Sequence, residues 1–391
     1  MSRLSRPVLA GLVVASLAPA GTAAAEPIRV GMLLTLSGPP AALGQQARDG
    51  FMLAMEELGG ELGGVEAEVL VEDIELKPDV AQTKARALIE RDAVDVVVGT
   101  IFSNMLQAIF KPVIESDRVL LSPNAGPSAF AGRNCHPHFF AVSYQNDQNH
   151  EVLGRYAEDA GMASVVLLAP NYQAGRDSLA GFKRHYTGTI ADEVYVPLGH
   201  QDFSAEIARI AAADPQALFT FMPGGMGVRL VKQFRQAGLA DDVTFLSAFT
   251  VDETTLPAQG ADARGFFGGG VWAPDVDNDA SRAFVAAFDA RYDYLPGVYA
   301  MFGYDTAMLL DSAVAAVEGD LADTDAFAAA VAAADFTSLR GDFRFNNNHF
   351  PVQDFYLLEV AERDDGRFQT TIAAKVFDDD ADAYHADCGM E

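Results

Sequence analysis

The sequence predicts an α/β protein made of two doubly wound parallel-sheet lobes that are joined by a three-segment hinge. Apolar runs of strand length alternate with amphipathic helical patterns, and this alternation occurs in two successive series. A run that is apolar throughout is typical of a strand that is buried on both faces of a parallel sheet. A later stretch holds helical patterns with no strands between them, which indicates that the chain returns to the first lobe.

The first series begins with an apolar strand and continues through three helical patterns. Its strands are predicted at 28–34, 65–73, 94–99 and 119–123, and its helices at 41–60, 80–92 and 106–116. The second series begins with a helix. Its helices are predicted at 146–161, 175–186, 204–213 and 226–238, and its strands at 164–170, 193–197, 217–223 and 243–249.

Two long helical patterns, at 281–292 and 298–319, follow one another without an intervening strand. We therefore expect the chain to cross between the lobes near 143–146, 270–274 and 347–353, so that a cleft lies beneath a hinge. The predicted domains follow from these crossings. Lobe 1 comprises 26–143 plus 274–348, lobe 2 comprises 144–273 plus 349–377, and 378–391 form a C-terminal tail.

The first 25 residues read as a secretory signal peptide. Arg3 and Arg6 precede a short apolar run, and Ala23 to Ala25 offer a small-residue cleavage site before Glu26. The apolar run is too short to serve as a membrane anchor. An exported protein is expected, with no direct insertion into the membrane.

The chain is strongly acidic, with 55 Asp and Glu residues against 27 Lys and Arg residues and a formal charge of -28. Such a surface repels nucleic acid and anionic lipid, so neither is an expected partner. The only two cysteines are Cys135 and Cys388. An even count in an exported protein favours a disulfide, which would tie the tail to lobe 1. The alternative is a metal site formed by Cys135, His136 and His138, but Pro137 stiffens a spacing that matches no common zinc pattern.

The stretch VVVGTIFSNM, residues 96–105, resembles a ligand-holding loop at the end of a strand. It lacks the lysine of a phosphate loop and the second glycine of a serine-hydrolase elbow. Ser103 stands near a helix start, where its hydroxyl and free backbone N–H groups can hold a carboxylate. An ordinary helix cap is the alternative interpretation.

The loop at 120–130 repeats this strand, turn and helix pattern, so that two loops are expected to flank one crevice. Catalytic and metal-binding patterns are weak. The seven histidines form no pair at metal spacing on a helix, and His150 and His185 are expected on solvated helix surfaces. Asp305 is expected to brace a helix.

In order along the chain, the signal peptide, the segment from 28 to 57, VVVGTIFSNM, LLSPNAGPS and LLAPNYQAGRDSLAGFK resemble the periplasmic substrate-binding proteins of ABC importers. The resemblance is to the type I group related to leucine/isoleucine/valine-binding proteins, and it covers essentially the whole mature chain. It implies a monomeric binding protein with no enzymatic activity, no cofactor and no metal. The implied location is the periplasm, and the implied partners are a small carboxylate and the permease subunits of an ABC importer.

The resemblance also implies which residues bind the ligand. Ser103, with Phe102 beside it, and the loop of Asn124, Ala125 and Gly126 correspond to the groups that hold the ligand carboxylate. Tyr172, in a strand-to-helix loop of lobe 2, corresponds to the tyrosine that closes on the ligand. Hydroxyl and N–H groups suit a carboxylate, and aromatic rings suit an apolar body.

Two positions depart from the amino-acid binders of the family. Gly126 stands where a threonine or serine is usual, and Phe249 stands where an acid usually holds the ligand ammonium. Phe102, Phe249 and Trp272 offer apolar surface instead. A buried ammonium without a carboxylate partner is costly. The ligand expected from these departures is an aromatic acid, such as a benzoate or hydroxycinnamate, and NAGPS, NCHPHFF and DCGM resemble that branch.

Three other functions stay open at this stage. The first is a binder of branched-chain or other hydrophobic amino acids for the same class of importer. The second is a soluble sensor that feeds a receptor. The third is a periplasmic hydrolase that uses Ser103, although no base is visible near it in the sequence.

Overall fold

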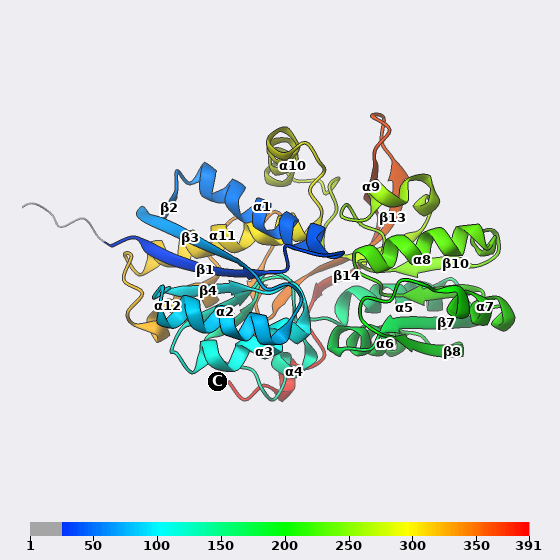
Figure 1. Cartoon of the computed structure of the whole chain (residues 1–391), viewed down its shortest axis with the longest axis horizontal. Coiled ribbons are helices and arrows are strands. Elements are labelled where there is room, and N and C mark those ends of the chain that lie inside the picture. The colour runs from blue at the N-terminus through cyan, green and yellow to red at the C-terminus, as the bar shows by residue number, and fades with distance from the viewer. Residues whose placement is uncertain (1–25, 391) are drawn as a thin grey trace, which may run out of the picture.

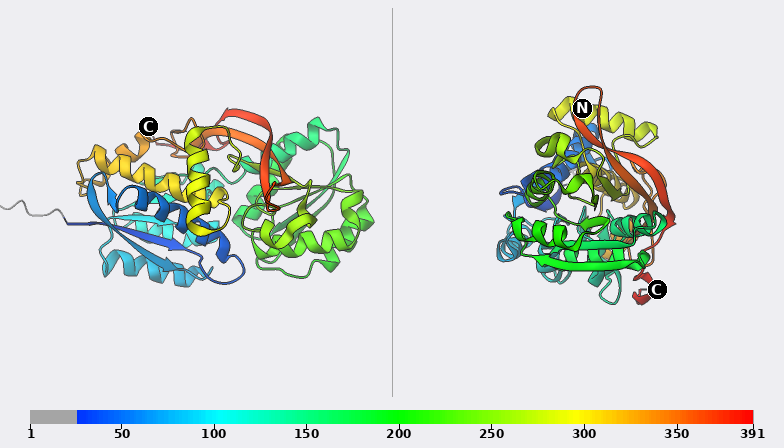
Figure 2. Two further views of the ribbon diagram at one scale, coloured as in Figure 1. Left: turned by 90° about the horizontal axis from the view of Figure 1, so that it is seen from above. Right: turned by 90° about the vertical axis from the view of Figure 1, so that its right-hand side faces the viewer.

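The computed structural model describes residues 26–390 as two α/β lobes side by side (Figure 1). The predicted signal peptide at 1–25 lies outside the described residues. Each lobe has a mostly parallel sheet covered by helices, which confirms the predicted fold class. Viewed from above, the lobes are linked by the orange and red strands near the C-terminus (Figure 2).

The sheet of lobe 1 has six strands in the order β2-β3-β1-β4-β5-β6. All neighbours in it are parallel except β2 and β3. The strands are β1 (Ile28–Leu34), β2 (Glu61–Leu62), β3 (Val65–Asp73), β4 (Val96–Gly99), β5 (Val119–Ser122) and β6 (Phe139–Ala141). The helices of this part of the fold are α1 (Ala41–Glu57), α2 (Pro78–Glu90), α3 (Ser103–Ile114), α4 (Ser128–Ala131), α10 (Asp279–Tyr292), α11 (Val298–Ala316) and α12 (Thr324–Ala333).

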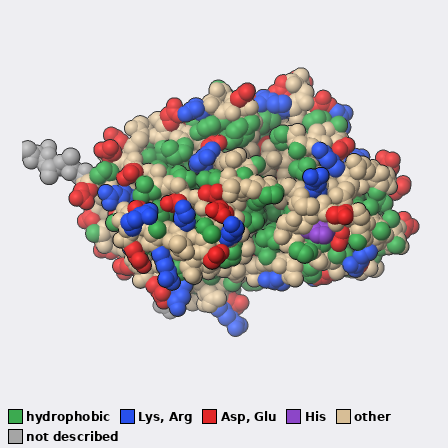
Figure 3. Space-filling view, viewed as in Figure 1, with side chains coloured by type: hydrophobic (Ala, Val, Ile, Leu, Met, Phe, Trp, Pro, Cys, Tyr) green, Lys and Arg blue, Asp and Glu red, His purple; other side chains and the backbone are tan. Residues whose placement is uncertain are grey.

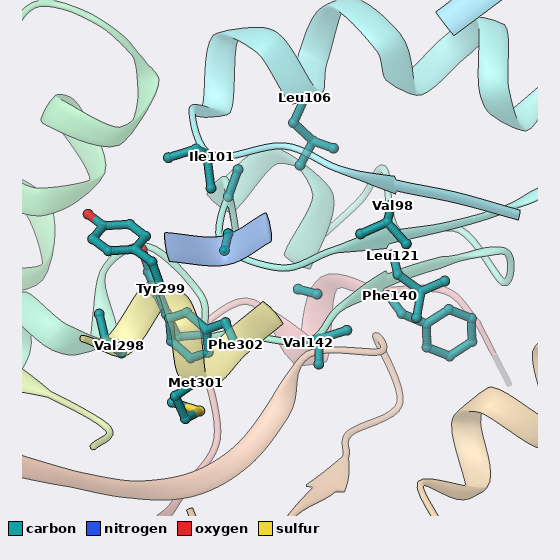
Figure 4. Packing of buried hydrophobic residues seen from close by; sticks show 14 of the residues in the cluster. Val98, Ile101, Leu106, Leu121, Phe140, Val142, Val298, Tyr299, Met301 and Phe302 are labelled. Atoms are coloured by element: carbon teal, nitrogen blue, oxygen red, sulfur yellow. The ribbon is translucent and has the colours of Figure 1, made fainter. Parts of the chain in front are cut away.

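Helix α11 packs tightly on α1, so the late helices return to lobe 1 as expected. Glycines at the crossing permit this approach. A Cβ at Gly50 would lie 1.9 Å from the oxygen of Ala300, and one at Gly303 would lie 2.0 Å from the oxygen of Ala47. The buried face of α11 contributes aromatic and aliphatic side chains to the hydrophobic core, among them Val298, Met301 and Phe302 (Figure 4).

The sheet of lobe 2 has the order β12-β13-β11-β10-β9-β7-β8, with β14 paired to β13. Its strands are β7 (Ser164–Pro170), β8 (Thr189–Val196), β9 (Ala217–Thr220), β10 (Thr244–Ser247), β11 (Phe267–Gly270), β12 (Arg344–Phe345), β13 (Pro351–Glu362) and β14 (Phe368–Asp380). Its helices are α5 (Gln148–Asp159), α6 (Gln173–His185), α7 (Ser204–Ala213), α8 (Gly225–Gln236) and α9 (Leu256–Gln259). The strands β7 to β11 pair with one another in parallel, whereas β13 runs antiparallel to β11, β12 and β14.

Three features of the C-terminal third differ from the elements expected from the sequence. Helix α12 was not expected, and neither was the long antiparallel pair of β13 and β14. Strand β12 lies in the stretch that was assigned to lobe 1, yet it pairs with the start of β13. The C-terminal tail starts later than residue 378, because β14 continues to Asp380.

After β14 the chain returns to lobe 1, where Cys388 forms a disulfide with Cys135 and the two Cα atoms are 5.7 Å apart. This confirms the predicted disulfide. This bond excludes the alternative metal site, because the sulfur of Cys135 is bonded to that of Cys388 and is not available as a metal ligand. His138 instead pairs with Asp325 of α12 at 2.7 Å.

Acidic and basic side chains are interspersed with apolar ones over the face shown in Figure 3. Within residues 26–390, no helix has the length and apolar character needed to cross a membrane.

Candidate ligand-binding site

A narrow cavity lies between the two lobes, at the carboxyl ends of their parallel strands. This is where open α/β sheets bind ligands. Six of the seven predicted site residues line it, namely Phe102, Ser103, Asn124, Ala125, Tyr172 and Phe249. The other lining residues are Leu43, Ile101, Tyr144, Asn146, His150, Ala174, Phe221, Pro223 and Tyr299.

Ser103 is the first residue of α3, and Phe102 precedes it as the N-cap. No side chain caps this helix end, so the interpretation of Ser103 as an ordinary helix cap is wrong. Backbone N–H groups in the first turn of a helix have no intrahelical partner, and they attract anions. The Ser103 hydroxyl oxygen accepts a hydrogen bond from Asn146 Nδ2 at 3.0 Å, which leaves its own hydrogen free to donate.

Asn124 and Ala125 form part of the cavity wall, and the polar groups of their loop bond mainly to the protein. Asn124 Nδ2 donates to the oxygen of Ile101 at 2.7 Å, and its Oδ1 accepts from the Tyr144 hydroxyl at 3.1 Å. The N–H of Ala125 donates to the oxygen of Thr100 at 3.1 Å. The loop therefore fixes the shape of the cavity.

Gly126 is the one predicted site residue that does not line the cavity. Its N–H donates to Asn146 Oδ1 at 3.1 Å. A Cβ here would lie 1.9 Å from the oxygen of Tyr144, so the site has no room for a serine or threonine side chain. The glycine at this position lets the Asn124 loop approach the first crossing between the lobes.

Aromatic rings make up much of the cavity wall. Tyr144 stacks on Phe249 with centroids 5.3 Å apart and an interplanar angle of 22°. Tyr172 stacks on Phe221 at 6.3 Å. Figure 4 shows the Tyr299 ring extending from α11 toward the loop that carries Ile101, and both residues line the cavity. Flat apolar surfaces of this kind suit a flat ligand.

Trp272 is not part of this wall. It is 1% exposed, and its indole Nε1 donates to Ser281 Oγ at 2.8 Å. Trp272 therefore contributes its apolar surface to a neighbouring part of the core and not to the cavity. The fluorescence of Trp272 would report ligand binding only indirectly.

None of the side chains that line the cavity is an Asp, Glu, Lys or Arg. Burial raises the pKa of the hydroxyls of Tyr144, Tyr172 and Tyr299. Burial also lowers the pKa of His150 to about 3. All four side chains are therefore neutral near pH 7, and the cavity offers neither a carboxylate to hold an ammonium nor a cationic side chain.

His150 is a residue that sequence reasoning placed wrongly. It was expected on a solvated helix surface, but it is 2% exposed and lines the cavity. The reason is that α5 starts directly after the first crossing, so its first turn points into the space between the lobes. Asn146 and Tyr144 were missed for the same reason, although both lie in or beside the predicted crossing at 143–146.

The lobes touch each other on both sides of the cavity, so the structure represents a closed arrangement. On one side, Ser128 Oγ donates to Asp177 Oδ1 at 2.8 Å. On the other side, the glycine turn before α8 packs on the turn before α1, where a Cβ at Gly224 would lie 3.2 Å from the Cα of Pro40. A ligand in this cavity would contact both lobes at once.

Comparison with known proteins agrees with this geometry. The model of a family described as periplasmic binding protein matches residues 27–367. A Brucella melitensis protein named Leu/Ile/Val-binding protein homolog 6 is 28% identical over 375 residues, which cover 92% of this chain and 94% of that protein.

Two solved structures are also similar. A solute-binding protein of an ABC transporter from R. palustris, in complex with benzoate, is 31% identical with a TM-score of 0.87. The match covers 92% of this chain and 98% of that one. A solute-binding protein from Rhodopseudomonas palustris BisB5, in complex with 3,4-dihydroxybenzoic acid, is 26% identical with a TM-score of 0.84, and the match covers 91% and 98% of the two chains.

A cleft between two doubly wound lobes, with an uncapped helix end facing it, is the arrangement of a two-lobed ligand-binding protein. This chain belongs to the periplasmic binding protein family. It is a solute-binding protein of an ABC transporter and not an enzyme, which sets aside the hydrolase interpretation of Ser103.

Proposed function

We propose that this protein binds an aromatic carboxylate and delivers it to the permease subunits of an ABC importer. The observation that carries the proposal is the neutral aromatic cavity with a site that suits an anion, at Ser103 and the first turn of α3. The ligands of the two Rhodopseudomonas structures, benzoate and 3,4-dihydroxybenzoic acid, support the same class.

We expect the carboxylate to lie at the start of α3, where the Ser103 hydroxyl and the free N–H groups can donate to its oxygens. We expect the ring to lie between Phe102, Tyr172 and Phe249, which line the cavity. The relatives that are named for leucine, isoleucine and valine support the alternative of an amino-acid ligand. An amino acid would bring an ammonium into a closed cavity without a carboxylate partner, which costs several kcal/mol, and each 1.4 kcal/mol is about tenfold in affinity.

The proposal extends to the working cycle of the protein. The mature chain, after cleavage before Glu26, acts as a monomer in the periplasm. Its two lobes, 26–143 plus 274–348 and 144–273 plus 349–377, close on the ligand because the ligand contacts both and favours the closed state. Small-angle scattering should show a smaller radius of gyration with a saturating aromatic acid than without ligand.

Calorimetry against benzoate, hydroxybenzoates, hydroxycinnamates, leucine, isoleucine and valine tests the ligand class. We expect tight binding of at least one aromatic acid and weak or no binding of the three amino acids. Ser103→Ala should weaken binding of the aromatic acid about 10- to 100-fold, because a hydrogen bond to a charged group is lost. Ser116→Ala, whose hydroxyl bonds to the oxygen of Val113 at the far end of α3, is the matched control. Micromolar binding of leucine with no response to any aromatic acid would restore the amino-acid interpretation.

A further inference from the structure

His150 projects from the first turn of α5 into the cavity between the lobes. Its ring is enclosed by phenylalanines of lobe 2. The ring centroids of Phe219, Phe221 and Phe249 lie 5.7, 5.2 and 6.2 Å away, and all three rings are roughly perpendicular to the imidazole. The imidazole is thus a hydrogen-bonding group that these three phenylalanine rings surround.

Within residues 26–390, the imidazole of His150 makes no hydrogen bond, and its Nδ1 is buried without a partner. Leaving such a group unpaired in the interior is costly, so buried polar groups nearly always have a partner. Since His150 lines the ligand cavity, a ligand atom is the partner that its position favours.

The chemistry of His150 limits what that ligand atom can be. Its pKa is lowered to about 3 by burial, so the ring is neutral near pH 7 and offers one donor and one acceptor. The carboxylate has a better place at Ser103, which lies in the other lobe and has the free N–H groups of α3 beside it. A second carboxylate near His150 would meet phenylalanine rings and no cation. A neutral hydroxyl, which both donates and accepts, matches the imidazole.

We propose that His150 recognises a hydroxyl group on the ring of the bound aromatic acid, at a position remote from the carboxylate. This proposal rests on the proposed function and adds the residue that sets specificity within the ligand class. His150 then acts as a specificity-determining residue: it favours hydroxylated aromatic acids over the unsubstituted acid, because only the former satisfies the imidazole in the closed cavity.

Calorimetry with benzoate and its three monohydroxy isomers tests the proposal. We expect 3- or 4-hydroxybenzoate to bind about tenfold or more tightly than benzoate, which corresponds to one good hydrogen bond in a dry site. In 2-hydroxybenzoate the hydroxyl lies beside the carboxylate and out of reach of His150. Any difference in affinity between this isomer and benzoate should therefore be the same in the wild-type protein and the His150 variant. His150→Phe should remove the preference for the 3- or 4-isomer over benzoate. His136→Phe, outside the cavity, should leave the preference unchanged.

Nitrogen NMR of the unmodified protein gives a second measurement that does not depend on a folded variant. The ring nitrogen signals of His150 should shift when the preferred hydroxybenzoate replaces benzoate, as expected for a new hydrogen bond. Equal affinities of the wild-type protein for benzoate and all its hydroxy isomers would overturn the role of His150 and leave the proposed function standing. Absence of binding by every aromatic acid would overturn the proposed function itself.

Discussion

Arg340 and Asp305 form an ion pair in the interior between the lobes, with Arg340 Nη2 3.1 Å from Asp305 Oδ2 and side-chain exposures of 2% and 0%. The guanidinium also donates to the oxygen of Val142 at 2.8 Å, the oxygen of Ser143 at 3.0 Å and Gln353 Oε1 at 2.6 Å. Ser143 belongs to the predicted first crossing between the lobes, with Val142 just before it, and Gln353 is the last residue of the predicted third crossing. A single cation thus joins two hinge segments to α11.

Removing one member of this pair should destabilise the protein strongly. Burial raises the pKa of Asp305 and lowers that of Arg340, so each charge depends on the other. Asp305→Ala should lower the free energy of unfolding by about 3–5 kcal/mol, because it leaves a buried charge without its partner. Urea denaturation followed by circular dichroism measures the change.

An exposed ion pair provides the matched control for that prediction. Arg344 and Asp379 are 2.7 Å apart with side-chain exposures of 56% and 58%. Arg344→Ala should cost less than about 1 kcal/mol, as is usual for surface pairs. If both variants lost a similar amount of unfolding free energy, the pair of Arg340 and Asp305 would not be the contact that stabilises the hinge segments.

Gly126 provides a prediction about the shape of the site. Gly126→Ser should weaken both stability and ligand binding, because its Cβ would meet the oxygen of Tyr144 at 1.9 Å. Overpacking of this kind typically costs about 1–3 kcal/mol. Thermal unfolding and calorimetry measure the two effects. Gly132→Ser is the control, since the nearest atom to a Cβ there is 3.5 Å away. If Gly126→Ser were as stable as the wild-type protein and bound leucine, the steric argument would be wrong. The missing hydroxyl at this position, and not a lack of room, would then be what excludes amino acids.

Much of the site could be predicted from the sequence because strand ends are visible in it. Ser103 and Asn124 follow two apolar strands of one parallel sheet, and such strand ends meet at the same edge. Tyr172 and Phe249 follow strands of the other sheet in the same way. The expectation of a flat apolar ligand body depended on the absence of an acid at Phe249, and the cavity has no acidic side chain in its wall.

The remaining features of the site and fold depend on tertiary packing, which the hydrophobic periodicity of the sequence does not reveal. His150 looks like a surface residue of an amphipathic helix, because the angle at which α5 leaves the first crossing is set by tertiary packing. Helix α12 was missed although Asp323 is a proper N-cap that accepts from the N–H of Ala326 at 3.0 Å. Its alanine-rich sequence gives little amphipathic contrast. The exact domain boundaries stay a prediction.

The disulfide should contribute measurably to stability because it closes a loop with a sequence separation of 253. On the chain-entropy model, its loss costs up to about 5 kcal/mol. The double variant Cys135→Ser, Cys388→Ser should therefore unfold at lower urea concentration than the wild-type protein. The intact mass under non-reducing conditions should be lower by two hydrogens than that of the reduced chain. Two cysteines open to alkylation in the native exported protein would contradict the bond.

The last prediction concerns pH and Glu253, a 5% exposed residue in the loop after β10. Its Oε1 accepts hydrogen bonds from the N–H and the hydroxyl of Thr370, both at 2.8 Å. A Cβ at Gly297, at the start of α11, would lie 3.0 Å from the Cβ of Glu253, so the carboxyl is packed between the two lobes. Burial, with a smaller contribution from the charge of Asp252, raises the pKa of Glu253 from 4.5 to about 7.

The sign of the effect follows from which state holds the proton. Between pH 4.5 and 7 the folded protein keeps Glu253 protonated while the unfolded chain has lost that proton, so folding is favoured less as pH rises. The contribution is complete below pH 4.5 and is lost as pH rises through 7. At about 1.4 kcal/mol per pH unit, it amounts to roughly 3 kcal/mol. Urea denaturation across pH 4.5–8 should show this slope in the wild-type protein. Glu253→Gln, which mimics the protonated side chain, should reduce the slope, whereas Glu66→Gln on the exposed side of β3 should retain it. Identical slopes in the two variants would refute the assignment of this titration to Glu253.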